Sequence, residues 1–439
     1  MNQMATNLES VTTERAAESM TAARRYYALF VLTLVCTANF FNRQVLTLLL
    51  EPIRHELSLS DTQVGFLTGI AFTFVNVTLS IPVARLADRW SRRKVIALAV
   101  AVWSTMTVFC GLAQSFVQLF LARMGVGAGQ AGGSPPSHAL TGDLFPREQR
   151  ATAIAVLLLS TPLGMALGFL WGGWGLGELG WRQAFILAGL PGFLISALVL
   201  FTLPELRKGM ADGVRAPLQQ PPFWVTVRLL WSIRSLRNMT IACMLQTFLQ
   251  MGLTLWVPSF LMRSYGLSPK TVGTGMALAF GIGLTVGTLL GGRLIDVLGR
   301  REVRWHFWIA AVAVVLAASC SLGAFTGPPR YVFLLLGAQI MFGSFFASSL
   351  TAISQSLVPV AVRATTIACV LFVINVFAIG IGPQVMGIVS DLLRAAYGED
   401  SLRITLIGSA MSAFPAALLY FLASLTYRSD LAAADVRRC

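Results

Sequence analysis

Twelve long apolar runs follow one another along this 439-residue chain, separated by short polar segments. An α-helix needs about 20 residues to cross the apolar core of a bilayer, and it satisfies its own backbone hydrogen bonds there. Only 12% of the residues are charged, against about a quarter in an ordinary soluble domain. The sequence therefore predicts an all-α membrane protein with twelve transmembrane helices. The expected spans are residues 26–50, 63–86, 94–113, 116–141, 150–173, 182–203, 237–262, 269–295, 304–325, 331–356, 363–391 and 403–427.

The basic residues alternate between the two sides of these spans. Of the 33 Lys and Arg residues, 24 fall in the tails and in the loops after the even-numbered spans, and seven fall in the opposite loops. Cytoplasmic loops carry such an excess, so both termini are expected in the cytoplasm and the chain in the cell (inner) membrane. The net charge of +14 is spread over many loops rather than one face, which argues against nucleic-acid binding.

A segment of the first half recurs in the second. Residues 84–93 (ARLADRWSRR) match residues 292–301 (GRLIDVLGRR), and the pentapeptide RATAI at 150 matches RATTI at 363. The offsets, 208 and 213 residues, are nearly equal, which indicates an internal 6+6 repeat. The expected organisation is a cytoplasmic tail (1–23), a six-helix bundle (24–203), a cytoplasmic linker (204–236), a second six-helix bundle (237–428) and a cytoplasmic tail (429–439).

Two arginines, Arg43 and Arg123, fall within apolar spans. A charge at a helix centre costs about 2.5–3.5 kcal/mol on insertion scales, so such residues usually mark function. Arg43 is flanked by Asn39 and Asn42, and its guanidinium could bind a phosphate or carboxylate. Arg123 has an alternative role as an anchor that reaches the cytoplasmic interface. Polar and small residues share the helical face of Arg123, namely Gly127, Gln130, Ser134, Ser137 and Thr141.

The second half offers fewer charges than the first, and its candidates are polar side chains. The candidate binding residues there are Gln246, Gln250, Gln339 and Asn375. The alternative for each is a hydrogen bond between helices. A charged first half and an apolar second half suit a ligand with an anionic head and a hydrocarbon tail. The Pro135-Pro136 pair is expected to bend the helix over 116–141.

The repeated segments and Arg123 resemble the signature motifs of the major facilitator superfamily, and the resemblance covers nearly the whole chain. It implies the 6+6 fold of that superfamily and a secondary transporter that works by alternating access. Ala84 and Ser91 stand where glycines are common in the motif. The resemblance also implies a latch on the cytoplasmic side, although the same charges could merely set topology. The expected gating residues are Asp88, Arg89, Arg92, Arg93, Arg123, Asp296 and Arg300.

Asn42-Arg43, the segment 129–137 (GQAGGSPPS) and the segment 143–146 (DLFP) resemble the spinster branch of the superfamily. That branch implies an anionic amphiphile as substrate, such as a lysophospholipid or a sphingoid phosphate, and proton coupling through acids. Asn42 and Gln130 occupy the positions of those acids, and neither amide can titrate. Two interpretations stay open. The chain is a natural uncoupled or anion-exchanging carrier, or the two acids were replaced deliberately to mimic the protonated protein.

Other functions compete with this one: an organic-acid or sugar-acid transporter, a multidrug exporter, and a receptor on a transporter frame. An enzyme is not expected, because the chain has no metalloprotease motif, phosphate-binding loop or nucleophile–base pair. The GxGxxG match at 127–132 lies in an apolar span without a preceding strand. The three histidines and six cysteines are scattered, so no metal, cofactor or disulfide is expected. The expected partners are a small amphiphilic or anionic substrate and the lipid bilayer, with the protein a monomer.

Overall fold

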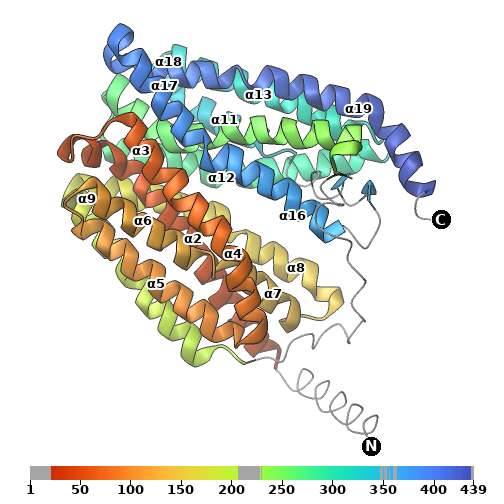
Figure 1. The fold of residues 1–439 in the computed structure, drawn as a ribbon, viewed down its shortest axis with the longest axis horizontal. Coiled ribbons are helices and arrows are strands. Elements are labelled where there is room, and N and C mark those ends of the chain that lie inside the picture. Colours follow the sequence, from red (N-terminus) through yellow and green to blue (C-terminus); the bar gives the residue numbers. More distant parts are fainter. Residues whose placement is uncertain are drawn as a thin grey trace, which may run out of the picture. The chain divides into compact units, whose positions relative to one another are not determined.

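The computed structural model describes residues 21–205, 228, 230–346, 350, 353, 354, 356–358 and 363–436. The side chains at positions 81, 88, 89, 147, 363, 364, 368 and 434–436 lie outside that description, as do most of the predicted N-terminal tail and of the predicted linker. Every regular element within the described residues is helical (Figure 1).

The first half is a series of helices joined by short turns. A capping box at Ser60 and Gln63 starts α3, and serine side chains cap α5 and α6. Gly180 lies inside α9 with φ of 78°, a conformation that favours glycine, and it separates two helical segments. The helices are α2 (Ala22–Glu56), α3 (Asp61–Thr68), α4 (Ile70–Arg89), α5 (Arg92–Leu112), α6 (Phe116–Gln130), α7 (Ser134–Leu144), α8 (Arg147–Leu158) and α9 (Ser160–Thr202).

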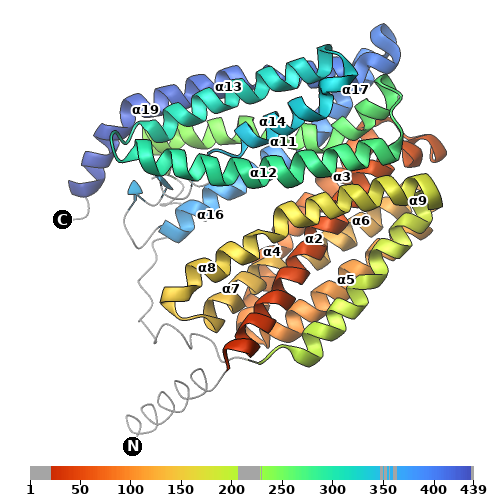
Figure 2. The ribbon, with the colours of Figure 1, turned by 180° about the vertical axis from the view of Figure 1, so that it is seen from behind.

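The second half follows the same plan with more interruptions. The π-helix η3 breaks the helix that the sequence predicts over 363–391. The elements are α11 (Arg234–Ser264), α12 (Pro269–Gly299), α13 (Trp305–Thr326), η1 (Pro329–Tyr331), α14 (Val332–Gly343), α16 (Arg363–Ile374), η3 (Asn375–Gly380), α17 (Gly382–Tyr397), η4 (Gly398–Asp400), α18 (Ser401–Ala410) and α19 (Ala413–Val436). Figure 2 shows α11, α13 and α19 running alongside one another.

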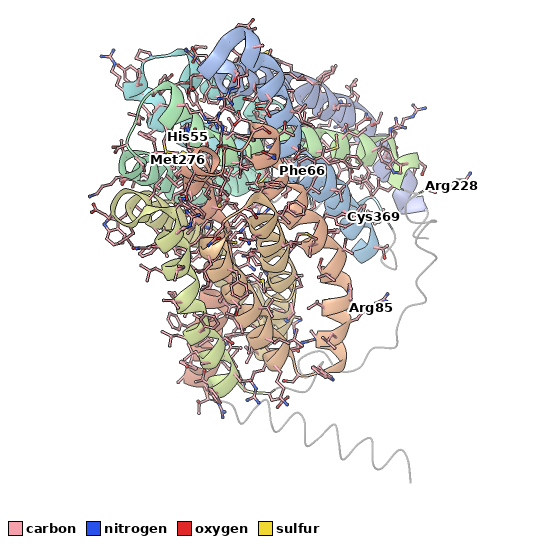
Figure 3. All side chains as sticks on the ribbon, turned by 60° about the vertical axis from the view of Figure 1, so that its left-hand side comes forward. His55, Phe66, Arg85, Arg228, Met276 and Cys369 are labelled. Atoms are coloured by element: carbon pink, nitrogen blue, oxygen red, sulfur yellow. The ribbon has the colours of Figure 1, made fainter. Side chains whose placement is uncertain are left out.

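Within the part of the chain that the structure describes, eight helical stretches are long and apolar enough to cross a membrane. Two of them, Glu148–Thr202 with 55 residues and Thr365–Ala433 with 69, are long enough for two spans each. The remaining predicted spans correspond to the broken pair α6 and α7 and to α14. Large apolar side chains such as Leu194 and Phe201 are more than three-quarters exposed, as expected of a surface that faces lipid. Phe66 of α3, labelled in Figure 3, is another exposed aromatic side chain. The prediction of an all-α, twelve-span membrane protein is confirmed.

The chain forms two compact units. Unit 1 comprises Met1–Leu46, Val75–Gly168 and Leu179–Pro217, and unit 2 comprises Thr47–Phe74, Phe169–Glu178 and Leu218–Cys439. Unit 2 thus contains the end of α2, all of α3 and the start of α4, although the sequence repeat assigns these segments to the first bundle. The bundle boundaries inferred from the repeat stay a prediction.

Within unit 2, α3 packs directly on α17. Glycines make this contact close: a methyl group at Gly65 would stand 2.8 Å from the carbonyl oxygen of Pro383 and 2.9 Å from Cα of Gln384. A methyl group at Gly69 would likewise meet the Gly380 carbonyl oxygen. The two helices therefore touch backbone to backbone.

Candidate functional site

In unit 1 the polar residues of α2, α6 and α7 come together. The Gln130 side chain donates from Nε2 to the backbone oxygen of Asn39 over 3.2 Å, and both side chains are at least nine-tenths buried. The thiol of Cys36, one turn earlier on α2, contacts the hydroxyls of Ser134 and Ser137 on α7. These contacts bring the three segments together, and the assignment of Asn39, Gln130 and Ser134 to a substrate site stays a prediction.

The bend in the fourth span lies earlier than expected. α6 ends at Gln130 and α7 begins at Ser134, so the chain turns over residues 131–133. Pro135 and Pro136 occupy the first turn of α7, where a missing backbone N–H breaks no helical hydrogen bond. The prediction that the prolines bend the helix is corrected: the turn precedes them. A methyl group at Gly133 would meet the Trp103 ring and, at 3.0 Å, the Asn39 amide nitrogen.

Both arginines belong to unit 1. Arg123 in α6 is 2% exposed, which contradicts the alternative of an anchor reaching the membrane interface. Arg43 in α2 is partly buried, and the two guanidinium groups are close enough to repel one another. A pair of neighbouring positive charges in a poorly hydrated place favours an anionic ligand.

The two amides at the positions of the expected acids are only half satisfied. Asn42 is 3% exposed and donates from Nδ2 to the Ala38 carbonyl oxygen over 3.0 Å. No described residue donates to Asn42 Oδ1 or to Gln130 Oε1. A buried acceptor without a donor costs about 1–3 kcal/mol, so these two oxygens are available to a proton-bearing group.

Three glutamines of the second half gather around Gly343 of α14 in unit 2. Gln246 donates from Nε2 to the Gly343 backbone oxygen over 2.8 Å, and it accepts from the Tyr420 hydroxyl over 2.5 Å. A methyl group at Gly343 would stand 3.6 Å from the Gln250 amide nitrogen and 3.8 Å from that of Gln339. Gln246 therefore links α11, α14 and α19, which supports the interhelical alternative for this residue. Asn375 begins η3 and is partly buried, and among the described residues no hydrogen bond joins it to the glutamines.

Replacing Gln246 with alanine should reduce stability, because the Tyr420 hydroxyl and the Gly343 oxygen would both lose their partner. Hydrogen bonds between membrane helices contribute about 0.6–1.7 kcal/mol each. We expect a lower thermal unfolding temperature in detergent, measured by intrinsic fluorescence. Replacement of Gln250, which is more exposed, is the matched control, and an equal loss in the two variants would contradict the special role of Gln246.

The motif after the second span forms ion pairs within unit 1. Arg92 pairs with Asp143 at the end of α7. Arg93 donates to the Leu203 oxygen over 3.2 Å and pairs with Glu205 over 3.3 Å. The Ser91 hydroxyl, helped by Arg93, holds the pKa of Glu205 below its ordinary value. These contacts connect the motif to the ends of two helices of its own unit.

The remaining gating candidates are less well defined. The side chains of Asp88 and Arg89 lie outside the described residues, so their predicted latch role stays a prediction. Asp296 and Arg300 are exposed, and neither pairs with a residue in the described part of the chain.

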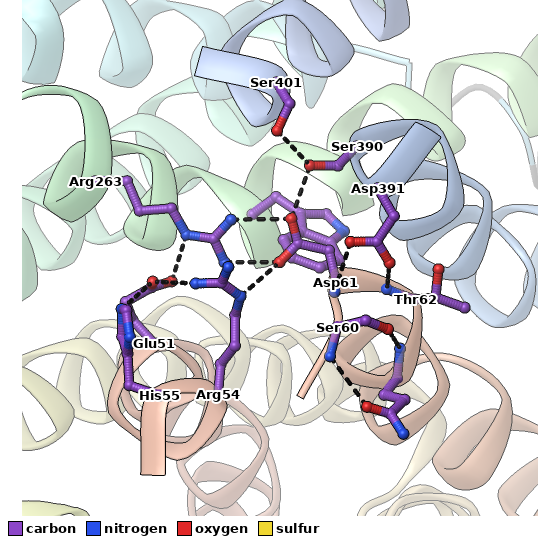
Figure 4. A network of polar contacts seen from close by, with 12 residues as sticks. Glu51, Arg54, His55, Ser60, Asp61, Thr62, Arg263, Ser390, Asp391 and Ser401 are labelled. Atoms are coloured by element: carbon purple, nitrogen blue, oxygen red, sulfur yellow. Dashed lines mark hydrogen bonds and ion pairs between the residues drawn. The ribbon is translucent and has the colours of Figure 1, made fainter. Parts of the chain in front are cut away.

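A buried charge ring lies in unit 2, where α2 turns into α3 (Figure 4). It consists of Glu51, Arg54, Asp61 and Arg263. Arg54 pairs with Glu51 and with Asp61, each over 3.1 Å. Arg263, from α11, pairs with Glu51 over 2.6 Å and holds Asp61 through two bonds of 2.8 and 2.9 Å. Positive and negative groups thus alternate around a closed circuit.

Further polar groups surround the ring. Ser390 of α17 donates to Asp61 over 2.7 Å, and the Asp391 carboxylate accepts from the backbone N–H groups of Asp61 and Thr62. His55 lies 3.1 Å from Glu51. Sequence reasoning assigned Arg54 and Arg263 to loops as topology charges and missed the ring.

Comparisons with known proteins point to one family. The sequence model of the Major Facilitator Superfamily matches residues 32–383. An MFS-type efflux pump of Mycolicibacterium smegmatis is 35% identical over 416 residues, covering 93% of this chain and 94% of the pump. A sphingosine-1-phosphate transporter of Mus musculus is 25% identical and covers 92% of this chain and 78% of its own length. The crystal structure of a bacterial homologue of the human lysosomal transporter Spinster, inward-facing and unoccupied, aligns with a TM-score of 0.84 at 28% identity, covering 94% of this chain and 99% of its own.

Proposed function

The chain belongs to the Major Facilitator Superfamily, and from that premise we propose that it carries an anionic amphiphile across the membrane by alternating access, without proton coupling. It is a spinster-like, multi-pass membrane transporter, and the predictions of the family and of a protein that is not an enzyme are confirmed. The amphiphile, the absence of coupling and the residues involved belong to the proposal.

The pair Arg43 and Arg123 carries the proposal. Arg123 is 2% exposed and Arg43 is partly buried, and together the two guanidinium groups raise the local positive potential, which favours an anionic ligand. A phosphate or carboxylate headgroup would supply the negative charge and accept the forked donors of an arginine. The relative that transports sphingosine-1-phosphate, a phosphate-bearing amphiphile, supports this class of substrate.

The same region supports the lack of proton coupling. Coupling requires a group that binds a proton on one side and releases it on the other. Asn42 and Gln130 stand where the spinster branch has acids, and amides do not titrate in the physiological range. Flux of a labelled lysophospholipid or sphingoid phosphate into proteoliposomes, with and without a pH gradient, tests the proposal directly. Uptake above the equilibrium distribution that follows the gradient would contradict it.

Export of hydrophobic compounds is a second candidate, because the relative with 35% identity is named an efflux pump. The arginine pair favours anions and disfavours the cationic compounds that many exporters carry. Parallel flux assays with a cationic dye and with an anionic amphiphile of similar size distinguish the two functions. Export of the dye alone would favour the second.

The orientation, with both ends cytoplasmic in an inner membrane, and the monomeric state also remain proposals. The positive-inside distribution of Lys and Arg supports the orientation. Cys439, in the C-terminal tail, should react with an impermeant maleimide only after the cells are opened.

Replacing Asp88 with alanine should slow transport and leave expression unchanged. The resemblance assigns this carboxylate to a latch that stabilises one conformation, and losing one such contact changes the rate of interconversion rather than the fold. Proteoliposome flux normalised to protein amount measures the effect. Asp296→Ala, at the repeat position, is the matched comparison, and a normal flux rate in both variants would exclude the latch.

A further inference from the structure

An apolar groove lies on the surface of unit 2, between α12 and α14. Figure 2 shows these two helices side by side, and the groove has a volume of about 850 Å³. Its walls include Leu278, Ile282 and Val286 of α12 and Phe333, Leu334 and Met341 of α14. Leu278 and Ile282 are more than half exposed, and Leu334 is 72% exposed. An exposed apolar surface of this extent marks a place where an apolar partner binds.

Glycines set the direction and length of the groove. A methyl group at Gly275 would collide with the Phe333 ring, and one at Gly283 would stand 2.7 Å from the Gly337 carbonyl oxygen. The contacts thus advance together along both helices, so α12 and α14 run parallel and begin at the same end of the groove. From Thr271 to Val286 the groove follows about 22 Å of α12, at 1.5 Å per residue. The apolar core of a bilayer is about 30 Å thick, so the groove is long enough for an acyl chain.

The beginning of the groove carries positive charge. Lys270, in the first turn of α12, lines the groove, and every other described residue of the lining is uncharged. Arg330 lies in η1, directly before α14, and its guanidinium stands over the Tyr331 ring, 4.6 Å from the ring centre. Lys270, Arg330 and Tyr331 are all exposed. Tyrosine is enriched where helices meet lipid headgroups, so this end of the groove is expected at the headgroup level.

From this arrangement we propose that the α12–α14 groove binds one anionic diacyl phospholipid of the surrounding bilayer. The headgroup would lie at Lys270 and Arg330, and an acyl chain would lie between the two helices. An apolar groove that begins at two cations matches a phosphate joined to hydrocarbon, and each basic residue at the membrane surface adds to the affinity for an anionic lipid. The inference does not depend on the proposed transport function and uses none of the residues assigned to it.

A second copy of the chain fits the groove less well. Two copies related by a twofold axis along the membrane normal would place the same end of each groove at the interface. Lys270 and Arg330 of one copy would then lie near those of the other, and like charges at close range repel one another. An anionic lipid neutralises the same cations.

One carboxylate competes for the head end of the groove. Glu178 lies 4.0 Å from the Lys270 ammonium group, and both side chains are more than half exposed. An exposed ion pair of this kind contributes little, so a lipid phosphate can displace Glu178 from the lysine. Glu178→Gln should therefore tighten the binding of an anionic lipid about two- to fivefold, without changing the binding of a zwitterionic one.

Native mass spectrometry of the detergent-solubilised protein measures this binding in the absence of substrate. Phosphatidylglycerol and phosphatidylcholine with the same acyl chains are titrated separately, and the Kd of the first bound lipid is compared. We expect at least about a tenfold preference for phosphatidylglycerol. Lys270→Gln and Arg330→Gln should each weaken phosphatidylglycerol about fivefold, and together about thirtyfold, while phosphatidylcholine is unaffected. Arg394→Gln removes another exposed arginine of unit 2 and should change neither Kd.

The acyl chain is tested by filling the groove. Ala338→Phe adds bulk to the wall of α14 and should weaken both lipids, whereas Leu418→Phe, at an exposed position of α19, should weaken neither. A phosphatidylglycerol with a diazirine in its acyl chain should crosslink to residues 271–286 or 333–341, and Ala338→Phe should remove that crosslink.

Three results would overturn the lipid site. The first is equal affinity for the two lipids in the unchanged chain, and the second is a preference that survives the loss of both cations. The third is a dimer that dissociates in Ala338→Phe, which would assign the groove to a second copy. A failed flux assay with an intact lipid preference would instead refute the proposed substrate alone.

Discussion

Replacing Arg43 with alanine is expected to abolish flux of an anionic amphiphile while leaving the protein folded. Arg43 is partly buried, beside Arg123 and on the same helix as Asn39 and Asn42. A hydrogen bond to a charged group contributes about 1.5–3 kcal/mol, which corresponds to a loss of roughly ten- to hundredfold in affinity. Thermal-shift titration with a lysophospholipid or a sphingoid phosphate measures that loss in the same preparation that is used for flux.

The conservative change Arg43→Lys separates charge from geometry. Lysine keeps the positive charge but cannot present the planar fork, so we expect intermediate affinity. Loss of affinity in Arg123→Ala would assign the headgroup to both arginines. Normal binding and flux in Arg43→Ala would exclude this residue from the substrate site, whatever the substrate is.

Restoring acids at the two amide positions, in Asn42→Asp with Gln130→Glu, should create pH-driven accumulation. The changes are nearly isosteric, and the free oxygens of both amides already lack a donor from any described residue. A carboxylate there would neutralise the nearby arginines and could bind and release a proton during the transport cycle. Uptake by proteoliposomes, with an imposed pH gradient that is then collapsed by an ionophore, measures the coupling.

The single variants and a matched control complete this experiment. Asn39→Asp places an acid one turn from Asn42 on α2, at a position that the spinster resemblance does not mark, and it should leave transport uncoupled. If the double variant transports without responding to the gradient, the two positions do not carry the coupling proton in this chain. If the unchanged chain already accumulates substrate, the amides are not the reason for any lack of coupling.

The span pattern was predictable because a bilayer fixes the length and polarity of each helix. Helical spacing predicted that Gln130 and Ser134 share a face, whereas the contact of Gln130 with Asn39 depends on how α6 packs on α2. The position of the bend was predicted wrongly, because a proline in the first turn of a helix breaks no helical hydrogen bond, and the chain turns over residues 131–133 before the two prolines. The burial of Arg123 depended on packing that its distance from a helix end does not reveal.

The charge ring shows a different limit of sequence reasoning. Arg54 and Arg263 each lie near a helix end, where a basic residue ordinarily meets water or lipid headgroups. Only the fold brings them to the same two carboxylates, and no local pattern encodes a contact between residues so far apart in the chain.

The direct backbone contact between α3 and α17 affects how these two helices can move relative to one another. Gly65 and Gly69 face the backbone around Pro383 and Gly380, so the two backbones approach closely at these positions without a side chain between them. At these positions the two helices can slide or separate with little steric resistance. For the same reason the contact does little to prevent misalignment. The exact position of α3 on α17 then has to be fixed by directional charge pairs at the edge of this contact. A bulkier residue at Gly65 would collide with the backbone of α17 and should favour separation of α3 from α17, even where every charge is intact.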